Sequence, residues 1–332
     1  MKKLVAFIMM MVMVFSMAGC GSSEKSSDTA AESQTAMTIC MALNGSINDK
    51  GWNYSCYKGL KQVEKDLGAK VVYTENVEDS DMVSVFKEYA DMKPDLVIGT
   101  GQQFYEAISD VAGEYPDVEF VCLNGDAGNG KNLTAYNFTN WEPGYIAGAL
   151  AGLVTKTNKV AAIGGFEFTA IATSQKAYEA GAKAVNPDCD VQLVYINSFT
   201  DAGACKEASN SLISQGCDVL MANASSAGLG TIEACVDAGV YNVGFIDDQY
   251  ESGPDVVLLS ALQSNDKMII KMCEDAQAKK LDHSITVLGT ADGVEGISDW
   301  HGWDEKLDAS VAEKVNDIVE DLKAGKIENP LE

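Results

Sequence analysis

Residues 37–73, MTICMALNGSINDKGWNYSCYKGLKQVEKDLGAKVVY, contain the pattern that decides the fold class. Met37–Leu43 is a short apolar run, which is typical of a buried strand. Tyr54–Leu67 then carries apolar residues at helical spacing, and Gly68 predicts the end of that helix. Lys70–Tyr73 predicts a second strand. A strand, a helix and a strand in this order indicate two parallel strands joined by a helical crossover.

The same alternation continues along the rest of the chain in two series. Further strands are predicted at Asp95–Gly99, Val118–Leu123, Leu133–Phe138, Lys159–Gly164, Asp190–Ile196, Asp218–Ala222, Asn242–Ile246, Val256–Leu262 and Ile285–Leu288. Helices are predicted at Ser80–Asp91, Phe104–Ala112, Glu142–Val154, Thr169–Val185, Asp201–Gln215, Leu229–Ala238, Asn265–Lys279 and Ala309–Ala324.

Short apolar strands joined by helices form parallel sheets that are covered on both faces. We therefore predict an α/β fold with two doubly wound parallel-sheet lobes and a hinge. Lobe 1 is expected to contain residues 37–138 and 262–283, and lobe 2 residues 139–261 and 284–332. No polar linker separates the two series, so several close crossings between the lobes are expected.

The composition excludes several classes of protein. The chain has 332 residues, of which 46% are hydrophobic and 22% charged, which argues against wholesale disorder. Its formal charge is −25, and all its cations are lysines. Without a basic face it is not expected to bind nucleic acid, and without arginine it has no guanidinium fork for phosphate. Two histidines, His283 and His301, argue against a histidine-rich metal centre.

The N-terminus reads as an export signal rather than as part of the fold. Lys2 and Lys3 precede the apolar run Leu4–Met17, which at about 14 residues is shorter than the roughly 20 needed to span a membrane. Met17-Ala18-Gly19-Cys20 resembles a bacterial lipobox. The resemblance implies a signal peptide at 1–19, a diacylglyceryl group on the Cys20 sulfur and a lipid-anchored protein on the extracytoplasmic face of the cell membrane. An ordinary signal with a chance cysteine is the alternative.

Residues 20–36 form the predicted tether. Gly21–Ala36 is rich in Ser, Ala, Thr and Glu without an apolar period, which predicts a flexible segment. Loss of the leader removes Lys2 and Lys3 from a chain of charge −25, so the mature charge is −27.

Eight further cysteines show no metal-site or disulfide-framework spacing. Several lie inside apolar runs, where cysteine behaves as a small hydrophobe. We predict mostly buried free thiols, and no metal or cofactor.

Ligands of open α/β sheets bind beyond the carboxyl ends of the strands. The segments expected there are rich in Gly, Asn, Ser, Asp and aromatic residues, which suits a small polar ligand; they are Leu43–Asn53, Gly99–Phe104, Asn124–Asp126, Gly164–Thr169, Asn197–Asp201, Asn223–Gly230 and Asp247–Tyr250. Aromatic residues that could line this cleft are Trp52, Phe104, Phe138, Trp141, Phe166 and Phe199.

Three motifs in these segments leave enzymatic alternatives open. Gly99-Thr100-Gly101 is a partial dinucleotide fingerprint, although a tight turn also explains its glycines. Ala224–Gly228 resembles a nucleophile elbow, in which Ser226 would be the nucleophile of a serine hydrolase and His301 its base. Asp247-Asp248 could act as acid and base, accept hydrogen bonds from ligand hydroxyls, or cap a turn.

Met41–Lys61, MALNGSINDKGWNYSCYKGLK, resembles the opening of the basic membrane protein family. These lipoproteins bind purine nucleosides for ABC importers. Further matches in family order are Tyr145–Gly148, Gly164-Gly165, Ala180-Gly181, Ala184–Pro187, Ser198–Asp201, Gly228–Gly230 and Asp248-Gln249. The resemblance covers residues 37 to 330, and it implies a type I substrate-binding protein whose two lobes close on a ligand without a catalytic step.

The resemblance also implies roles for single residues. Trp52 and Phe199 match aromatic positions that sandwich a purine, and Asn53 matches a neighbouring pocket residue. Gly228 and Gly230 match the loop near the sugar. The predicted ligand-binding residues are Asn48, Asp49, Trp52, Asn53, Phe104, Asn124, Phe199, Ser225, Ser226, Gly228, Asp247, Asp248 and Gln263.

Charged positions of the family pattern are replaced in this chain. Leu43 and Asn124 stand where the family has aspartate, and Ile246 aligns with the first aspartate of an Asp-x-Asp-Gln motif. Gln263 stands where the family has lysine, and Ala224–Gly228 replaces an Ala-Gly-Gly-Thr-Gly loop. We therefore expect a neutral nucleoside or related heterocycle as ligand, an ABC permease as partner, and a monomer. A sensory lipoprotein without a transport role is the second alternative.

Overall fold

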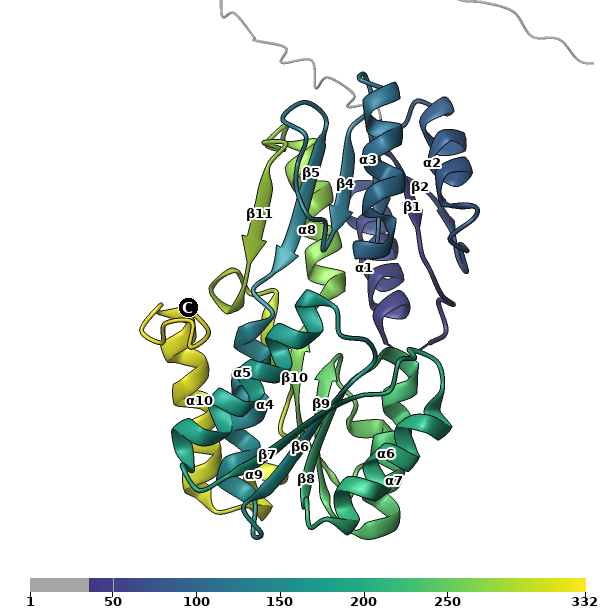
Figure 1. The fold of residues 1–332 in the computed structure, drawn as a ribbon. Coiled ribbons are helices and arrows are strands. Elements are labelled where there is room, and N and C mark those ends of the chain that lie inside the picture. The colour runs from purple at the N-terminus through teal and green to yellow at the C-terminus, as the bar shows by residue number, and fades with distance from the viewer. Residues whose placement is uncertain (1–35, 50) are drawn as a thin grey trace, which may run out of the picture. The chain divides into compact units, whose positions relative to one another are not determined.

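Two six-stranded sheets carry the fold in a computed structural model that describes residues 36–49 and 51–332 (Figure 1). The first sheet has the order β11 (Ile285–Leu288), β5 (Leu133–Phe138), β4 (Phe120–Leu123), β3 (Leu96–Gly99), β1 (Thr38–Ala42) and β2 (Lys70–Thr74). The second has the order β12 (Glu295–Ile297), β10 (Val257–Gln263), β9 (Tyr241–Ile246), β8 (Val219–Asn223), β6 (Lys159–Gly164) and β7 (Asp190–Tyr195). All neighbouring strands are parallel except β10 and β12, which confirms the predicted α/β class.

Helices cover both faces of the first sheet, because successive strand residues point to opposite faces. Ile39 of β1 packs in a core with α1 (Trp52–Leu67) and α8 (Asn265–Gln277). Cys40, the next residue, packs in a second core with α2 (Met82–Asp91) and α3 (Tyr105–Glu114). The first sheet is thus buried on both sides, as its near-continuous apolar strands predict.

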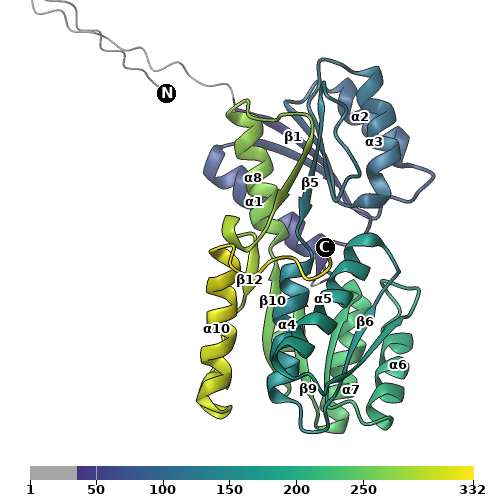
Figure 2. The ribbon, with the colours of Figure 1, turned by 60° about the vertical axis from the view of Figure 1, so that its left-hand side comes forward.

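The second sheet is covered in the same way (Figure 2). One core lies beneath α4 (Trp141–Val154), α5 (Thr169–Val185) and α10 (Ala309–Lys323). The other lies beneath α6 (Ala202–Ser214) and α7 (Leu229–Ala238). The short helix α9 (Trp303–Lys306) and strand β12 have no counterpart in the sequence prediction.

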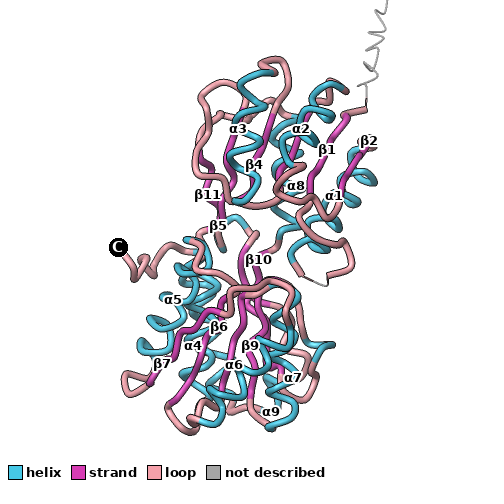
Figure 3. The backbone as a smooth tube through the Cα atoms, turned by 45° about the vertical axis from the view of Figure 1, so that its right-hand side comes forward, coloured by secondary structure: helices cyan, strands magenta, loops and turns pink. Residues whose placement is uncertain are grey.

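The chain crosses between the two sheets three times, which confirms the expected close crossings (Figure 3). It crosses from β5 to α4, from β10 to α8, and from β11 to β12. The predicted lobe boundaries at 262 and 284 are displaced. Strand β10 reaches Gln263 in the second sheet, and β11 pairs with β5, so Ile285–Leu288 belongs to lobe 1. The sequence of a four-residue strand does not reveal which sheet it joins.

Helices α4 and α5 pack at unusually short range through glycines. A Cβ atom on Gly144 would lie 2.2 Å from the Ser174 carbonyl oxygen, and one on Gly148 would lie 1.9 Å from the Tyr178 carbonyl oxygen. Gly181 of α5 is as close to the carbonyl oxygen of Tyr145, at 2.1 Å. The N-termini of these two helices lie at the pocket described below, so this packing sets part of its wall.

The eight cysteines within the described residues are all buried and free, which confirms the predicted thiols. Burial raises the pKa of Cys40 to about 11 and that of Cys273 to about 12, so both stay protonated at neutral pH. The predicted signal peptide, most of the tether and the lipidation site Cys20 lie outside the described residues. Within the described residues, no helix has the length and apolar character needed to cross a membrane.

Candidate ligand-binding site

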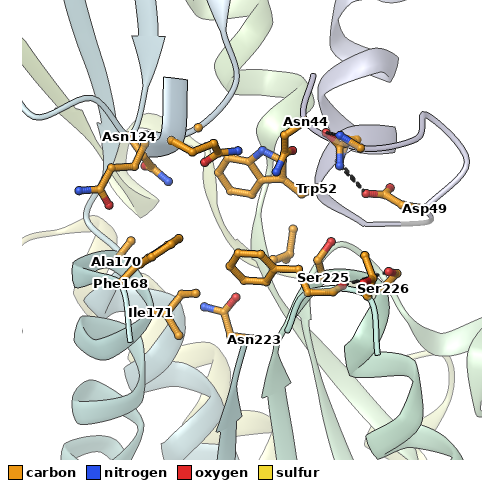
Figure 4. A pocket seen from close by; sticks show the side chains of 18 of the residues that line it. Asn44, Asp49, Trp52, Asn124, Phe168, Ala170, Ile171, Asn223, Ser225 and Ser226 are labelled. Atoms are coloured by element: carbon orange, nitrogen blue, oxygen red, sulfur yellow. Dashed lines mark hydrogen bonds between the residues drawn. The ribbon is translucent and has the colours of Figure 1, made fainter. Parts of the chain in front are cut away.

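A pocket of about 520 Å³ lies where the carboxyl ends of strands from both sheets meet. Figure 4 shows Asn44, Asp49, Trp52 and Asn124 on the side of the first sheet. Phe168, Asn223, Ser225 and Ser226 lie opposite them, on the side of the second sheet. The other lining residues are Gly45, Ser46, Asn48, Asn53, Asn76, Glu78, Gly101, Gln102, Gln103, Asn140, Ala170, Ile171, Phe199, Thr200, Ile246 and Gln263.

The loop after β1 is held by Asp49 at the start of α1. Its carboxylate accepts hydrogen bonds from the backbone N–H groups of Gly51, Asn53 and Tyr54 at 2.9 to 3.0 Å. The Asn53 side-chain amide donates a further bond to Asp49 at 2.9 Å. A carboxylate at a helix N-terminus is stabilised by the unpaired N–H groups there. Asp49 therefore shapes the pocket wall, and most of its hydrogen-bonding capacity is already used.

Trp52 is fixed at the boundary between the lobes. Its indole Nε1–H donates to the carbonyl oxygen of Thr100 at 2.7 Å, and its ring packs against core residues of both lobes. The Thr100 hydroxyl in turn donates to the Ala42 carbonyl at 2.8 Å. The only donor of the indole is thus satisfied, which leaves the ring to offer an apolar surface to the pocket.

Three phenylalanines cluster on the wall from lobe 2. Phe166 and Phe168 are stacked with ring centroids 5.5 Å apart, and Phe199 meets both rings edge-on at 4.9 and 6.0 Å. A Cβ atom on Gly165 would lie 2.4 Å from the Phe199 ring, so glycine is needed for this arrangement. Phe168 is 41% exposed and lines the pocket. It lies in the segment Gly164–Thr169 that is expected at the site, but the aromatic residues predicted to line the cleft include Phe166 and Phe199 and not Phe168.

Side-chain amides dominate the polar part of the lining. Ten lining residues are Asn or Gln, so the pocket offers both donors and acceptors without charge. The Asn124 Oδ1 atom is buried and has no hydrogen-bond partner among the described residues. Asn223 donates to the Ser174 hydroxyl at 3.0 Å, and Gln263 donates to the side chain of Asn140 at 2.9 Å. An unpaired amide oxygen at a pocket wall suits a donor group on a ligand.

Backbone strain is concentrated around the same pocket. Asn124, Asn140, Ser225 and Ile246 line it and have φ between 50° and 76°. Asparagine tolerates this left-handed region, but a β-branched residue such as Ile246 rarely adopts it. Strained residues of this kind cluster at ligand sites, where the surrounding structure holds them in place.

The described lining carries acidic groups but no cation. Asp49 and Glu78 are its charged residues, while Lys50 lies outside the description. Leu43, at a position where the family pattern has aspartate, is fully buried in the core of lobe 1.

Nine of the thirteen predicted ligand-binding residues line this pocket, and their contact with a ligand stays a prediction. Phe104 does not line it, because the turn Gln102–Phe104 directs its ring into the core against Phe86 at 5.6 Å. Gly228 is buried beneath the wall, near Ala222. Lining residues outside these thirteen include Asn44, Gln102, Gln103, Asn140 and Asn223. All but Asn140 lie in segments that the sequence predicts at the ligand site.

Asp247 and Asp248 also lie outside the lining, and each has another partner. Asp247 accepts from the Lys58 ammonium of α1 at 3.0 Å, which is an ion pair between the lobes. Asp248 pairs with His301 at 2.7 Å.

The hydrolase alternative gains no support from the surroundings of Ser226. The Ser226 hydroxyl donates to the Phe199 carbonyl at 3.1 Å. His301 bonds with Asp248 and stacks on Tyr250, and His283 bonds with Glu119 at 2.9 Å. Neither histidine is among the lining residues of the described pocket, so Ser226 has no imidazole base there.

Residues 36–328 match a family model described as ABC transporter substrate-binding protein PnrA-like. The chain belongs to this PnrA-like family. The expected family is thereby confirmed. Basic membrane protein D of Borreliella burgdorferi is 26% identical over 242 residues, which cover 71% of each chain.

Two further comparisons find solute-binding proteins that are similar to this PnrA-like chain. A Haloferax volcanii protein with the name "Putative ABC transporter glucose-binding protein TsgA13" is 30% identical over 217 residues. The match covers 65% of this chain and 55% of that protein. The crystal structure of a solute-binding protein of an ABC transporter from Aeropyrum pernix has a TM-score of 0.79 at 19% identity, and it covers 88% of this chain and 92% of that one. This similarity in structure confirms the fold.

Proposed function

We propose that this PnrA-like protein captures a neutral planar heterocycle, with purine nucleosides as the first candidates, and delivers it to an ABC permease. The observation that carries the proposal is the composition of the pocket between the sheets. It combines aromatic rings from both lobes with ten side-chain amides and, within the described lining, no cation.

Aromatic stacking is the proposed source of affinity. Trp52 comes from lobe 1, and Phe168 and Phe199 come from lobe 2. A planar ring would contact aromatic faces from both lobes only when the lobes are closed around it. Stacking of a base on an aromatic side chain contributes about 1–3 kcal/mol.

The amides are proposed to select a neutral ligand. An amide can donate and accept, so it pairs with the mixed polar edge of a heterocycle or with sugar hydroxyls. Phosphate would meet Asp49 and Glu78 without a described cation to offset its charge. We therefore expect weak binding of nucleoside monophosphates.

The remaining parts of the proposal concern the anchor and the motion. A diacylglyceryl group on Cys20 would hold the protein at the extracytoplasmic face of the membrane. Rotation of the lobes about the three crossings would open and close the pocket. The alternatives, a serine hydrolase using Ser226 and a sensory lipoprotein without transport, have weaker support in the geometry and the family respectively.

Calorimetry on the purified protein tests the ligand class, after a thermal-shift screen of nucleosides, nucleobases, hexoses and nucleoside monophosphates. A ligand at 100 times its Kd should raise the free energy of unfolding by about 2.7 kcal/mol. Trp52→Ala should weaken nucleoside binding by roughly 5- to 150-fold, because it removes one stacking face. Tyr54→Ala, at an exposed neighbour outside the lining, is the matched control and should leave Kd unchanged.

Three other results of these assays would contradict the proposed ligand or the proposed function. Tight binding of a hexose that is insensitive to Trp52→Ala and Phe199→Ala would assign the pocket to sugars. Tight binding of a nucleoside monophosphate would contradict the argument from charge. Ester hydrolysis abolished by Ser226→Ala would favour the enzyme.

A further inference from the structure

One buried carboxyl group contacts all three crossings between the lobes. Glu295 opens β12, directly after the third crossing, and is 4% exposed. Its Oε1 atom accepts from the backbone N–H of Asn140 at 3.1 Å and from the Gln263 side-chain amide at 3.3 Å. Its Oε2 atom bonds with the Thr139 hydroxyl. Thr139 and Asn140 lie in the first crossing, and Gln263 ends β10 at the second.

The same cluster reaches into the pocket. Asn140 and Gln263 both line it, and they are bonded to each other at 2.9 Å. Gln263 and Glu295 are also register partners in the antiparallel pair of β10 and β12. A change in the position of Glu295 would therefore move two lining amides together with the crossings that carry them.

We propose that Glu295 is the positioning residue of the hinge: it binds the three crossings together and thereby sets where Asn140 and Gln263 stand in the pocket. This inference rests on the proposed function, because it takes the crossings as the hinge of a closing receptor. Neither the sequence pattern nor the family resemblance singled out Glu295.

The protonation state of Glu295 decides which hydrogen bonds it can make to the crossings. Burial and, to a smaller extent, the nearby Glu142 carboxylate raise its pKa, the hydrogen bonds from Thr139, Gln263 and Asn140 lower it, and the net pKa is about 8. In the neutral form, Glu295 could donate to the Thr139 hydroxyl and still accept the other two bonds. In the ionised form, it places a second buried carboxylate beside Glu142.

The charged groups around Glu295 are mostly acidic. The elements packed against β12 are β10, α4 and the short turn Thr290–Asp292. Strand β10 contributes the uncharged Gln263, and α4 contributes Glu142, which accepts from the Thr290 N–H at 2.6 Å. Asp292 accepts from the Gly289 N–H at 3.0 Å. Lys267 of α8 is a cation at the end of this turn, where its ammonium donates to the Gly293 carbonyl at 3.0 Å.

The proposal predicts a pH-dependent opening of the hinge. A carboxyl group that becomes exposed on opening returns to its ordinary pKa of 4.5. Between that value and about 8, the closed cluster holds a proton that the open one has lost. The opening constant should therefore rise by up to about tenfold per pH unit over this range and level off above it.

Hydrogen exchange of the full-length protein without ligand tests this inference. After correction for intrinsic exchange rates, segments 139–142 and 289–295 should show this rise between pH 5.5 and 7.5. Glu295→Gln preserves the shape of the side chain and cannot ionise, so its opening constant should not depend on pH. Asp275→Asn, at another buried carboxylate whose partners are Tyr136 and Lys271 and not crossing residues, is the matched control and should keep the wild-type slope.

Two results would overturn the inference. One is an opening constant that does not change with pH in the wild type. The other is an opening constant that changes equally with pH in the wild type and in Glu295→Gln. If Glu295 had a purely structural role, Glu295→Gln would change the protection of these segments at every pH and would leave the slope of the opening constant against pH unchanged. Because no ligand is used, a failure of nucleosides to bind would refute the proposed function and leave this test intact. If inosine binds, its saturation should lower the opening constant of the same segments, and no change there would also count against the inference.

Discussion

The close packing of α4 on α5 leads to a prediction with an unusual sign. Gly→Ala in the interior of a helix normally stabilises a protein by about 1 kcal/mol, because alanine has the higher helix propensity. At Gly148 the new Cβ atom would lie 1.9 Å from the Tyr178 carbonyl oxygen, where ordinary contact begins near 3.4 Å. The carbonyl belongs to the backbone of α5, so the helices themselves must separate by roughly 1.5 Å.

The expected cost follows from these two opposing effects. Overpacking of a well-packed core costs about 1–3 kcal/mol, and a contact with rigid backbone belongs at the upper end of that range. After subtraction of the gain in helix propensity, Gly148→Ala should lower the free energy of unfolding by about 2 kcal/mol. Because Asn140 and Phe168 directly precede α4 and α5, separation of these helices should also widen the pocket and weaken ligand binding.

Thermal unfolding followed by circular dichroism measures the effect. Gly148→Ala should lower Tm by about 4 °C or more. Gly113→Ala is the matched control, because Gly113 is also helical but a Cβ atom there would have no neighbour within 4 Å. That control should raise Tm slightly. If Gly148→Ala were as stable as wild type while Gly113→Ala behaved as expected, the close packing would be refuted.

Three further predictions concern pH, charge and the anchor. The pKa of Glu295 is about 8 in the folded protein, above its ordinary 4.5, so its contribution to stability is present at low pH and is lost as the pH rises through 8. Urea titrations should show the free energy of unfolding falling by at most about 1.4 kcal/mol per pH unit, and Glu295→Gln should flatten this pH dependence. Asp247→Asn removes the ion pair with Lys58 between the lobes, and calorimetry should show Kd rising less than about fivefold, with a smaller effect at high salt. A tenfold loss of affinity that salt does not change would mean that Asp247 contacts the ligand. Cys20→Ser should yield an unlipidated protein that is released into the medium, and unchanged membrane retention and mass would contradict the predicted anchor.

Local patterns explain how much of the fold could be predicted from the sequence. The helix expected at Tyr54–Leu67 ends at Gly68, whose φ of 63° is the left-handed conformation that glycine accepts readily. The strands Lys159–Gly164 and Leu133–Phe138 have the predicted bounds. Asn53, Asn124 and Ser225 could be placed at the pocket, because they follow strands whose carboxyl ends meet in a parallel sheet.

Residues whose role depends on a distant partner could not be assigned in this way. Phe104 follows a strand like the true lining residues, but its side chain enters the core beside Phe86. Asp247 directly follows β9, and its partner Lys58 is 189 residues away in the chain.

The sequence by itself therefore determined the α/β class, the family and the position of the ligand pocket relative to the strands. These properties follow from the periodicity of neighbouring residues and from short motifs. Only the tertiary structure decided that β11 joins the first sheet, that Phe168 lines the pocket, and that Glu295, one of 49 acidic residues, is buried among the crossings. Burial and hydrogen bonding of one side chain depend on contacts between segments that are far apart in the chain, and such contacts leave no local pattern.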